Sequence, residues 1–192
     1  MTDTKGPKSA GEHWVCSVLA QTGWAAALTR DGLERTDILA VQTGSVGRQA
    51  IEVQVKTASP SRRPNWPLGS KAQLPALSRH EWFALVVLQA DPTVAPRTFI
   101  VPRDHVAAGA WIHHQDWLTD PTARPGKRNA DASRAHVPVE VFERYENRWE
   151  FLGTPTDQVP VLLPRRLREL ARDERVGLPE GHPWRLALPD WN

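Results

Sequence analysis

The chain has 192 residues, of which 40% are hydrophobic and 24% charged, and its formal net charge is +2. This is the composition of a folded globular protein with a sizeable core, and it excludes a wholly disordered chain. The longest strictly apolar run covers only residues 83–88. About 20 residues are needed to cross a bilayer, so we expect no membrane span. The polar first residues and the single cysteine, Cys16, predict a cytoplasmic protein without disulfides.

The first predicted element is a helix over residues 9–22. Ser9 and Glu12 have the spacing of a capping box, and Gly23 has the conformational freedom that ends a helix. Residues 1–8 are the predicted flexible N-terminus. Glu12 has two interpretations: it is the capping partner of Ser9, or it is an inward carboxylate that faces a metal or a cation. Apolar side chains at helical spacing give the helix a core-facing stripe: Val15, Val18 and Leu19.

Two strands are predicted next, over residues 24–28 and 36–41, and Asp37 stands at the start of the second. The run over residues 50–57 then alternates apolar and polar side chains. As a strand it buries one set and projects the other set together on the opposite face. We expect a functional polar face, and an ordinary solvated strand face is the alternative. The buried set is Ile51, Val53 and Val55, and the projecting set is Glu52, Gln54 and Lys56.

A long irregular connection, rich in Pro, Ser, Arg and Gly, is predicted for residues 59–70. Trp66 lies in it among basic residues, where we expect its ring to stack on a nucleic-acid base. An exposed loop without such a role is the alternative. Four other tryptophans fall in apolar patterns and are predicted to lie in the core: Trp24, Trp82, Trp111 and Trp149.

Two more strands and a C-terminal extension complete the predicted elements. Residues 83–89 have the continuous apolar character of a strand buried on both faces, and residues 98–101 look like its neighbour. A short helix near residues 106–110 follows. Residues 119–192 are predicted to pack on the same domain as a helical and loop extension. Its predicted features are a basic loop with Lys127 and Arg128, and helices over residues 142–152 and 165–175.

The adjacent His113 and His114 are close in the sequence to Asp116, and these residue types are common metal ligands. Neighbouring side chains diverge on a helix or a strand. We therefore predict surface histidines here and no metal.

The polar residues around the third strand are the types that divalent-metal phosphodiester chemistry needs. Mg²⁺ binds hard oxygen ligands and uses only one or two carboxylates, which leaves room for water and a substrate phosphate. Asp37 and Glu52 offer carboxylates. Gln54 offers an amide oxygen, and main-chain carbonyls of the strand, that of Val55 among them, offer further neutral oxygens. Lys56, further along the same face, is placed to orient the attacking water and to neutralise charge on the phosphate.

In this order of elements and residues the sequence resembles the PD-(D/E)XK nuclease superfamily, which contains restriction endonucleases and Holliday junction resolvases. The resemblance rests on the helix with Glu12, the segment with Asp37, the segment from Glu52 to Lys56 and the apolar strands after it. It implies an α/β fold with a restriction endonuclease-like αβββαβ core over residues 9–118, its mixed central sheet flanked by helices. It also implies four site residues: Asp37 as principal metal ligand, Gln54 at the second acidic position, Lys56 as catalytic lysine and Glu12 as the helix glutamate.

Two positions depart from the superfamily pattern. Thr36 stands where the motif has proline, which is a common variation. Gln54 stands where an acid is usual, although some active relatives that resemble intron-encoded homing endonucleases carry glutamine there. Glu52 lies two residues earlier on the same strand face, and we expect it to supply the missing negative charge.

The resemblance implies an endonuclease that uses Mg²⁺ or Mn²⁺ to hydrolyse nucleic-acid phosphodiesters, with DNA favoured over RNA. Cutting both strands of a duplex often uses two active sites, which favours a homodimer. One alternative is a nuclease-fold module whose metal site has decayed at Gln54 and that binds nucleic acid or a protein partner. Another is a purely structural α/β protein. The expected nucleic-acid contacts are Arg62, Arg63, Trp66, Lys71, Lys127 and Arg128.

Overall fold

The structure is a computed structural model that describes residues 5–29, 33–44, 48–124 and 126–191. No helix in these ranges is long and apolar enough to cross a membrane. The chain forms two compact units. The first comprises the described residues of Met1–Pro64, Ser78–Pro102 and Tyr145–Val159, and the second comprises those of Asn65–Leu77, Arg103–Arg144 and Pro160–Asn192.

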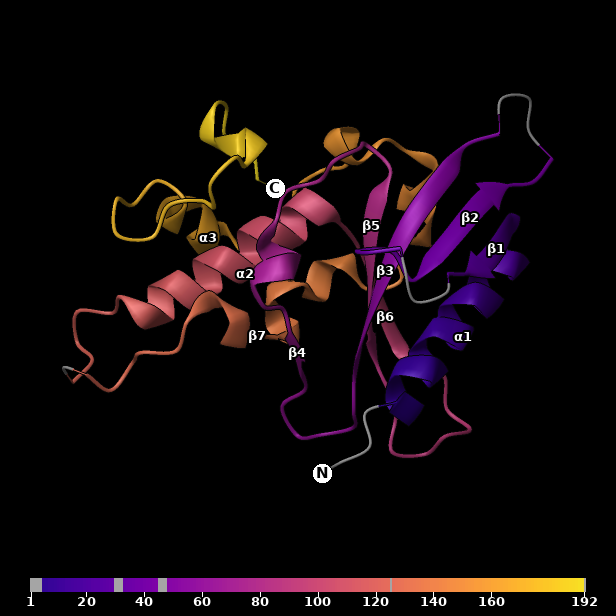
Figure 1. Ribbon diagram of the computed structural model, residues 1–192, viewed down its shortest axis with the longest axis horizontal. Helices are drawn as coiled ribbons and strands as arrows, with labels where there is room; N and C mark the ends of the chain where they lie inside the picture. Colours follow the sequence, from indigo (N-terminus) through magenta and orange to yellow (C-terminus); the bar gives the residue numbers. More distant parts are fainter. Residues whose placement is uncertain (1–4, 30–32, 45–47, 125, 192) are drawn as a thin grey trace. The chain divides into compact units, whose positions relative to one another are not determined.

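The first unit is built on a five-stranded mixed sheet (Figure 1). The strand order is β1-β2-β3-β5-β6, in which β3 and β5 run parallel and the other neighbouring pairs run antiparallel. This confirms the predicted mixed α/β class, and the strands fall on the segments that the apolar patterns predict. They are β1 (Trp24–Leu28), β2 (Ile38–Gln42), β3 (Ala50–Ala58), β5 (Glu81–Val87) and β6 (Arg97–Pro102).

The alternation predicted for β3 is present in the structure. Its apolar set is at most 3% exposed and belongs to the core of the first unit: Ile51, Val53 and Val55. Its polar set is half-buried: Glu52, Gln54 and Lys56. The parallel neighbour β5 is buried along its whole length, as expected of a strand covered on both faces. The sequence period thus places the polar set of β3 together and away from the core.

Helix α1 (Lys5–Gln21) begins earlier than predicted. Ser9 is therefore not its N-cap, and the Oγ of Ser9 lies 3.3 Å from Nδ1 of His13, one turn further along the helix. The segment before Ser9 is compatible with a helix because Pro7 lies in the first turn, where a missing N–H costs no hydrogen bond. Gly23, at a φ of +88°, follows the helix and lets the chain turn into β1.

At Gly11 the helix α1 lies very close to β3. Gly11 is buried, and a Cβ added to it would collide with the side chain of Thr57 on β3. Val15 and Leu19 lie on the same side of the helix and are fully buried in the core. The absent Cβ therefore sets how closely α1 approaches the strand that carries the polar set.

Gly11→Ala is expected to lower the free energy of unfolding by about 1–3 kcal/mol, because the added methyl group overpacks the contact with Thr57. Urea denaturation followed by circular dichroism measures the effect. Gly6→Ala is the matched control in the same helix, since no described atom lies within 4 Å of its Cβ position. Adding Thr57→Ala to Gly11→Ala is expected to restore most of the stability. Equal losses in the two glycine variants would contradict a close approach at Gly11.

The connection from β3 to β5 holds a strand and a 3₁₀ turn where the αβββαβ order predicts a helix. Strand β4 (Asn65–Pro67) pairs with β7 (His136–Pro138), and the turn η1 spans Ser70–Gln73. Trp66 on β4 is fully buried, with its ring centroid 6.4 Å from that of Phe142. The prediction of Trp66 as an exposed nucleic-acid contact is therefore wrong. Pairing with a segment distant in the sequence buries the ring, and local composition does not reveal that partner.

The helices of the second unit differ in length from those predicted. Helix α2 (Arg103–Leu118) is much longer than the short helix expected there, and α3 (Arg165–Leu170) is shorter than its prediction. In α2, His114 is 5% exposed, so its prediction as a surface histidine is wrong. Short 3₁₀ turns replace the helix predicted over residues 142–152: η4 (Glu143–Tyr145) and η5 (Trp149–Gly153).

Candidate active site

Asp37 directly precedes β2, and its carboxylate is anchored to β3. The main-chain N–H of Asp37 donates to the carbonyl oxygen of Val53 at 3.0 Å. The main-chain N–H of Val55 donates to Oδ2 of Asp37 at 2.8 Å. Val55 is the residue between Gln54 and Lys56. The carboxylate is thus fixed against the part of β3 that carries the two other motif residues.

A lysine connects this carboxylate to helix α1. Lys8 Nζ lies 3.4 Å from Oε1 of Glu12 and 3.6 Å from Oδ1 of Asp37. The Glu12 and Asp37 side chains are only 15% and 19% exposed, whereas that of Lys8 is 59% exposed. Glu12 therefore takes the second of its two predicted interpretations, an inward carboxylate beside a cation, and the capping-box interpretation is wrong.

The charge of Lys8 is maintained by its two partners. Burial lowers the pKa of the Lys8 ammonium, but the attraction of Asp37 and Glu12 outweighs burial and raises the pKa above its ordinary value. Sequence reasoning missed Lys8 because it assigned residues 1–8 to a flexible terminus. The available signals were its spacing to Glu12, four residues along a helix, and the scarcity of lysine, of which the chain has five.

Glu52, one residue before Val53 on β3, is held by a hydrogen bond. The hydroxyl of Thr36 donates to Oε2 of Glu52 at 2.8 Å, and Thr36 directly precedes Asp37. Glu52 also stands opposite Glu81 in the parallel register of β3 and β5. Glu52 is therefore tied to the segment that carries Asp37.

Glu81 and Arg35 form a second, more deeply buried pair that the sequence did not suggest. Their side chains are 6% and 16% exposed, and Arg35 Nη2 lies 3.1 Å from Oε2 of Glu81. The other carboxylate oxygen accepts from the N–H of Ser78 at 3.0 Å. Arg35 has a φ of +75°, a conformation that costs energy in a residue with a side chain. This pair fixes the backbone just before Thr36 and Asp37.

The side chains that approach Asp37 include possible ligands of a metal ion. Within the described ranges, no group of three or more His, Cys, Asp or Glu side chains is placed to hold a metal ion. Mg²⁺ uses one or two carboxylates with neutral oxygens and water. The Asp37 and Glu12 carboxylates already share a cation, the ammonium of Lys8. Asp37 and Glu12 are thus the described side chains here that could hold a cation.

The basic residues predicted to contact nucleic acid lie in both units. Arg62 and Arg63 are exposed after β3 in the first unit, whereas Lys71 and Lys127 are exposed in the second. Arg128, also in the second unit, is engaged by Asp120, with 2.8 Å between Nη1 and Oδ2. A cavity of about 520 Å³ lies beyond the ends of β3 and β5 and is lined in part by Arg62 and Arg97. The guanidinium of Arg97 donates two hydrogen bonds to the carboxylate of Glu146, at 2.8 and 2.7 Å, so its charge is balanced.

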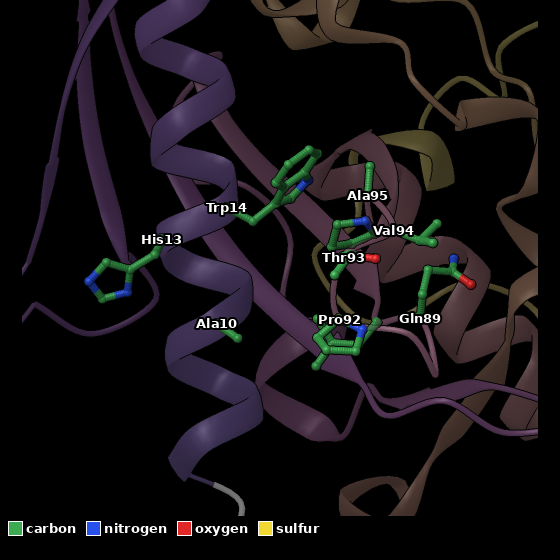
Figure 2. A pocket seen from close by; sticks show the side chains of 10 residues that line it. Ala10, His13, Trp14, Gln89, Pro92, Thr93, Val94 and Ala95 are labelled. Carbon is green, nitrogen blue, oxygen red and sulfur yellow. The ribbon is translucent and has the colours of Figure 1, made fainter.

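A separate cavity of about 550 Å³ lies between α1 and the segment that follows β5 (Figure 2). The indole N–H of Trp14 donates to Oγ1 of Thr98 at 2.9 Å and fixes the ring in its wall. Figure 2 shows that the ring of His13 points away from the other labelled side chains. None of the predicted site residues lines this cavity.

No protein-family model matches the chain, and no curated protein matches its sequence. Among solved structures, one described as a bacterial homing endonuclease superposes with a TM-score of 0.45 and 14% identity. The superposition covers 82% of this chain and 97% of that chain. A similarity with so low a TM-score and sequence identity does not assign a function to this chain, so a functional proposal rests on the geometry of the site.

Proposed function

We propose that the chain is a Mg²⁺- or Mn²⁺-dependent endonuclease that hydrolyses phosphodiesters of nucleic acid, DNA in preference to RNA. The observation that carries the proposal is the anchoring of the Asp37 carboxylate to the N–H of Val55, between Gln54 and Lys56. The alternation of β3 and the approach of Glu12 from α1 support it further. An ordinary solvated strand face does not explain why carboxylates from a helix and from a neighbouring segment lie together beside β3.

The metal ligands in this proposal are Asp37, helped by Glu52, together with the amide oxygen of Gln54 and the main-chain carbonyl of Val55. Oδ2 of Asp37 accepts from the N–H of Val55, and Oδ1, the oxygen that faces Lys8, would be the ligand. Glu12 and Glu52 add negative charge nearby. When bound, the metal supplies a Lewis acid that stabilises the charge developing on the phosphate.

Lys56 has a different task in the proposal. It lies on the same strand face as Gln54, one residue beyond the N–H that anchors Asp37. From there its ammonium orients the attacking water and neutralises charge on the phosphate oxygens. Arg62 and Arg63, exposed on the segment that follows β3, bind phosphates of the nucleic-acid backbone without reading its sequence.

Metal binding separates this proposal from its main alternative, a module whose site has decayed at Gln54. Calorimetric titration with Mn²⁺ is expected to give saturable binding that Asp37→Asn weakens by more than about tenfold. Asp190→Asn is the matched control, because that side chain is 98% exposed. Absence of Mn²⁺ binding, or binding that is equal in wild type and Asp37→Asn, would favour the decayed module.

A substitution of Lys8 is expected to change the Mn²⁺ affinity in the opposite direction, and the same titration measures it. Lys8→Met is expected to tighten Mn²⁺ binding several-fold, because it removes a positive charge that lies 3.6 Å from Oδ1 of Asp37. Two unit charges about 4 Å apart interact by about 1 kcal/mol even in water. Lys5→Met, on the same helix, is the control and is expected to leave the affinity unchanged. Weaker binding in Lys8→Met would show that Lys8 does not compete with the metal.

A further inference from the structure

A small cavity of about 250 Å³ in the second unit is lined mainly by planar polar rings. Its walls come from α2, from the 3₁₀ turn η2 (Ala132–Arg134) with the residues before it, and from β7. They combine three imidazoles, one indole and one guanidinium group. The lining residues are His113, His114, Trp117, Ala130, Arg134 and His136.

The two rings on one side of the cavity are held in place. His114 Nε2 donates to the carbonyl oxygen of Ala130 at 3.0 Å, and its ring centroid lies 5.7 Å from that of Trp117 at an interplanar angle of 31°. Arg128 lies over the indole at 5.6 Å and donates to the carbonyl oxygen of Trp117 at 2.7 Å. Trp117 is nevertheless 39% exposed. Part of Trp117 is therefore open to a planar ligand beside the guanidinium of Arg128.

The polar side of the cavity is also organised. Nδ1 of His136 donates to Oδ1 of Asn65 at 2.8 Å, which orients that ring. The Asp131 carboxylate accepts from the N–H of Ser133 and caps η2, the turn that presents Arg134. Arg134 is exposed, so its guanidinium is accessible to an anion.

The histidines of this cavity are suited to an organic ligand. Burial and the positive charge of Arg166 lower the pKa of His113, which favours the uncharged ring. In the part of the chain that the structure describes, no three His, Cys, Asp or Glu side chains are placed to hold a metal ion. Imidazole rings beside an indole offer faces for stacking and edges for hydrogen bonds.

We propose that this cavity binds one nucleotide, with the base against Trp117 and His114 and the phosphate on Arg134. Bases stack on aromatic side chains whatever their identity, and a guanidinium matches the geometry of a phosphate. A volume of about 250 Å³ is below the range of about 300–1,000 Å³ for drug-sized ligands, so the cavity admits a single base. The nucleotide is either free or part of a single strand, and the proposal does not depend on the proposed phosphodiesterase.

Calorimetry in EDTA, where metal-dependent cleavage plays no part, tests this site. The probes are AMP, a 5′-phosphorylated hexadeoxyadenylate and ribose 5-phosphate. Trp117→Leu and Arg134→Gln are each expected to weaken nucleotide binding about tenfold or more, and ribose 5-phosphate is expected to bind at least tenfold more weakly than the probe that binds best. Arg124→Gln, an exposed arginine outside the cavity, is the control.

The probes also identify the source of the nucleotide. Binding of AMP supports a free nucleotide, and binding of the hexadeoxyadenylate alone supports a nucleotide within a strand. Three results would overturn the site: neither nucleotide probe binds, the better probe binds both variants as tightly as wild type, or ribose 5-phosphate binds as tightly as that probe. Arg134 is exposed, so the Arg134→Gln variant is expected to fold and keeps the test decisive even if Trp117→Leu does not fold.

Discussion

Lys56→Ala is expected to lower the rate of DNA cleavage by at least about a hundredfold, the usual cost of removing a group that stabilises charge in the transition state. Lys56 is half-buried on the polar face of β3, next to the residue whose N–H holds Asp37, so its loss changes the site and leaves the core intact. Initial rates on plasmid DNA measure the effect. Mn²⁺ affinity and DNA affinity are expected to change little.

Two variants control for a general effect of lysine removal. Lys5→Ala removes a lysine that has no role in the proposed chemistry and is expected to cut at the wild-type rate. Lys56→Arg keeps the positive charge with a different shape, and is expected to retain more activity than Lys56→Ala. Cleavage by Lys56→Ala at an undiminished rate would remove Lys56 from the proposed chemistry.

Glu81→Ala is expected to lower the free energy of unfolding by about 3 kcal/mol, because it removes the carboxylate that pairs with the largely buried guanidinium of Arg35. The two side chains are 6% and 16% exposed, so solvent compensates little for the loss. Chemical denaturation measures the change. Glu150→Ala is the matched control, since its partner Arg148 and Glu150 are 48% and 59% exposed and such pairs contribute about 0–1 kcal/mol.

The same pair allows a second check. In the double variant Arg35→Met with Glu81→Leu neither charge is buried, so it is expected to recover most of the stability that Glu81→Ala loses. A double variant as unstable as Glu81→Ala would contradict an electrostatic origin of the loss.

The sheet was predictable from the sequence because its signals are local. The alternation from Ile51 to Lys56 fixes which side chains of β3 share a face, and the unbroken apolar run from Phe83 identifies a strand buried on both sides. The motif residues of β3 therefore fall on the half-buried face that the pattern predicts.

The rest of the site depends on contacts between distant segments. Whether Glu12 faces solvent or Asp37 depends on where α1 starts and on how closely Gly11 lets it approach β3. The same is true of Trp66, whose burial follows from the pairing of β4 with β7. Arg35 and Glu81 meet only because β5 lies beside β3. In each of these contacts the two partners lie too far apart in the sequence for a short stretch of residues to reveal them.

Cleavage of supercoiled plasmid DNA tests the central claim most directly, with wild type and Asp37→Asn compared in Mg²⁺ and in EDTA. We expect wild type to convert the plasmid to nicked or linear product only in Mg²⁺, and Asp37→Asn to leave it supercoiled in both. Asp190→Asn, altered at an exposed carboxylate, is expected to cut like wild type. Cutting that persists in EDTA, or that is equally fast in Asp37→Asn, would contradict a metal-dependent site built on Asp37.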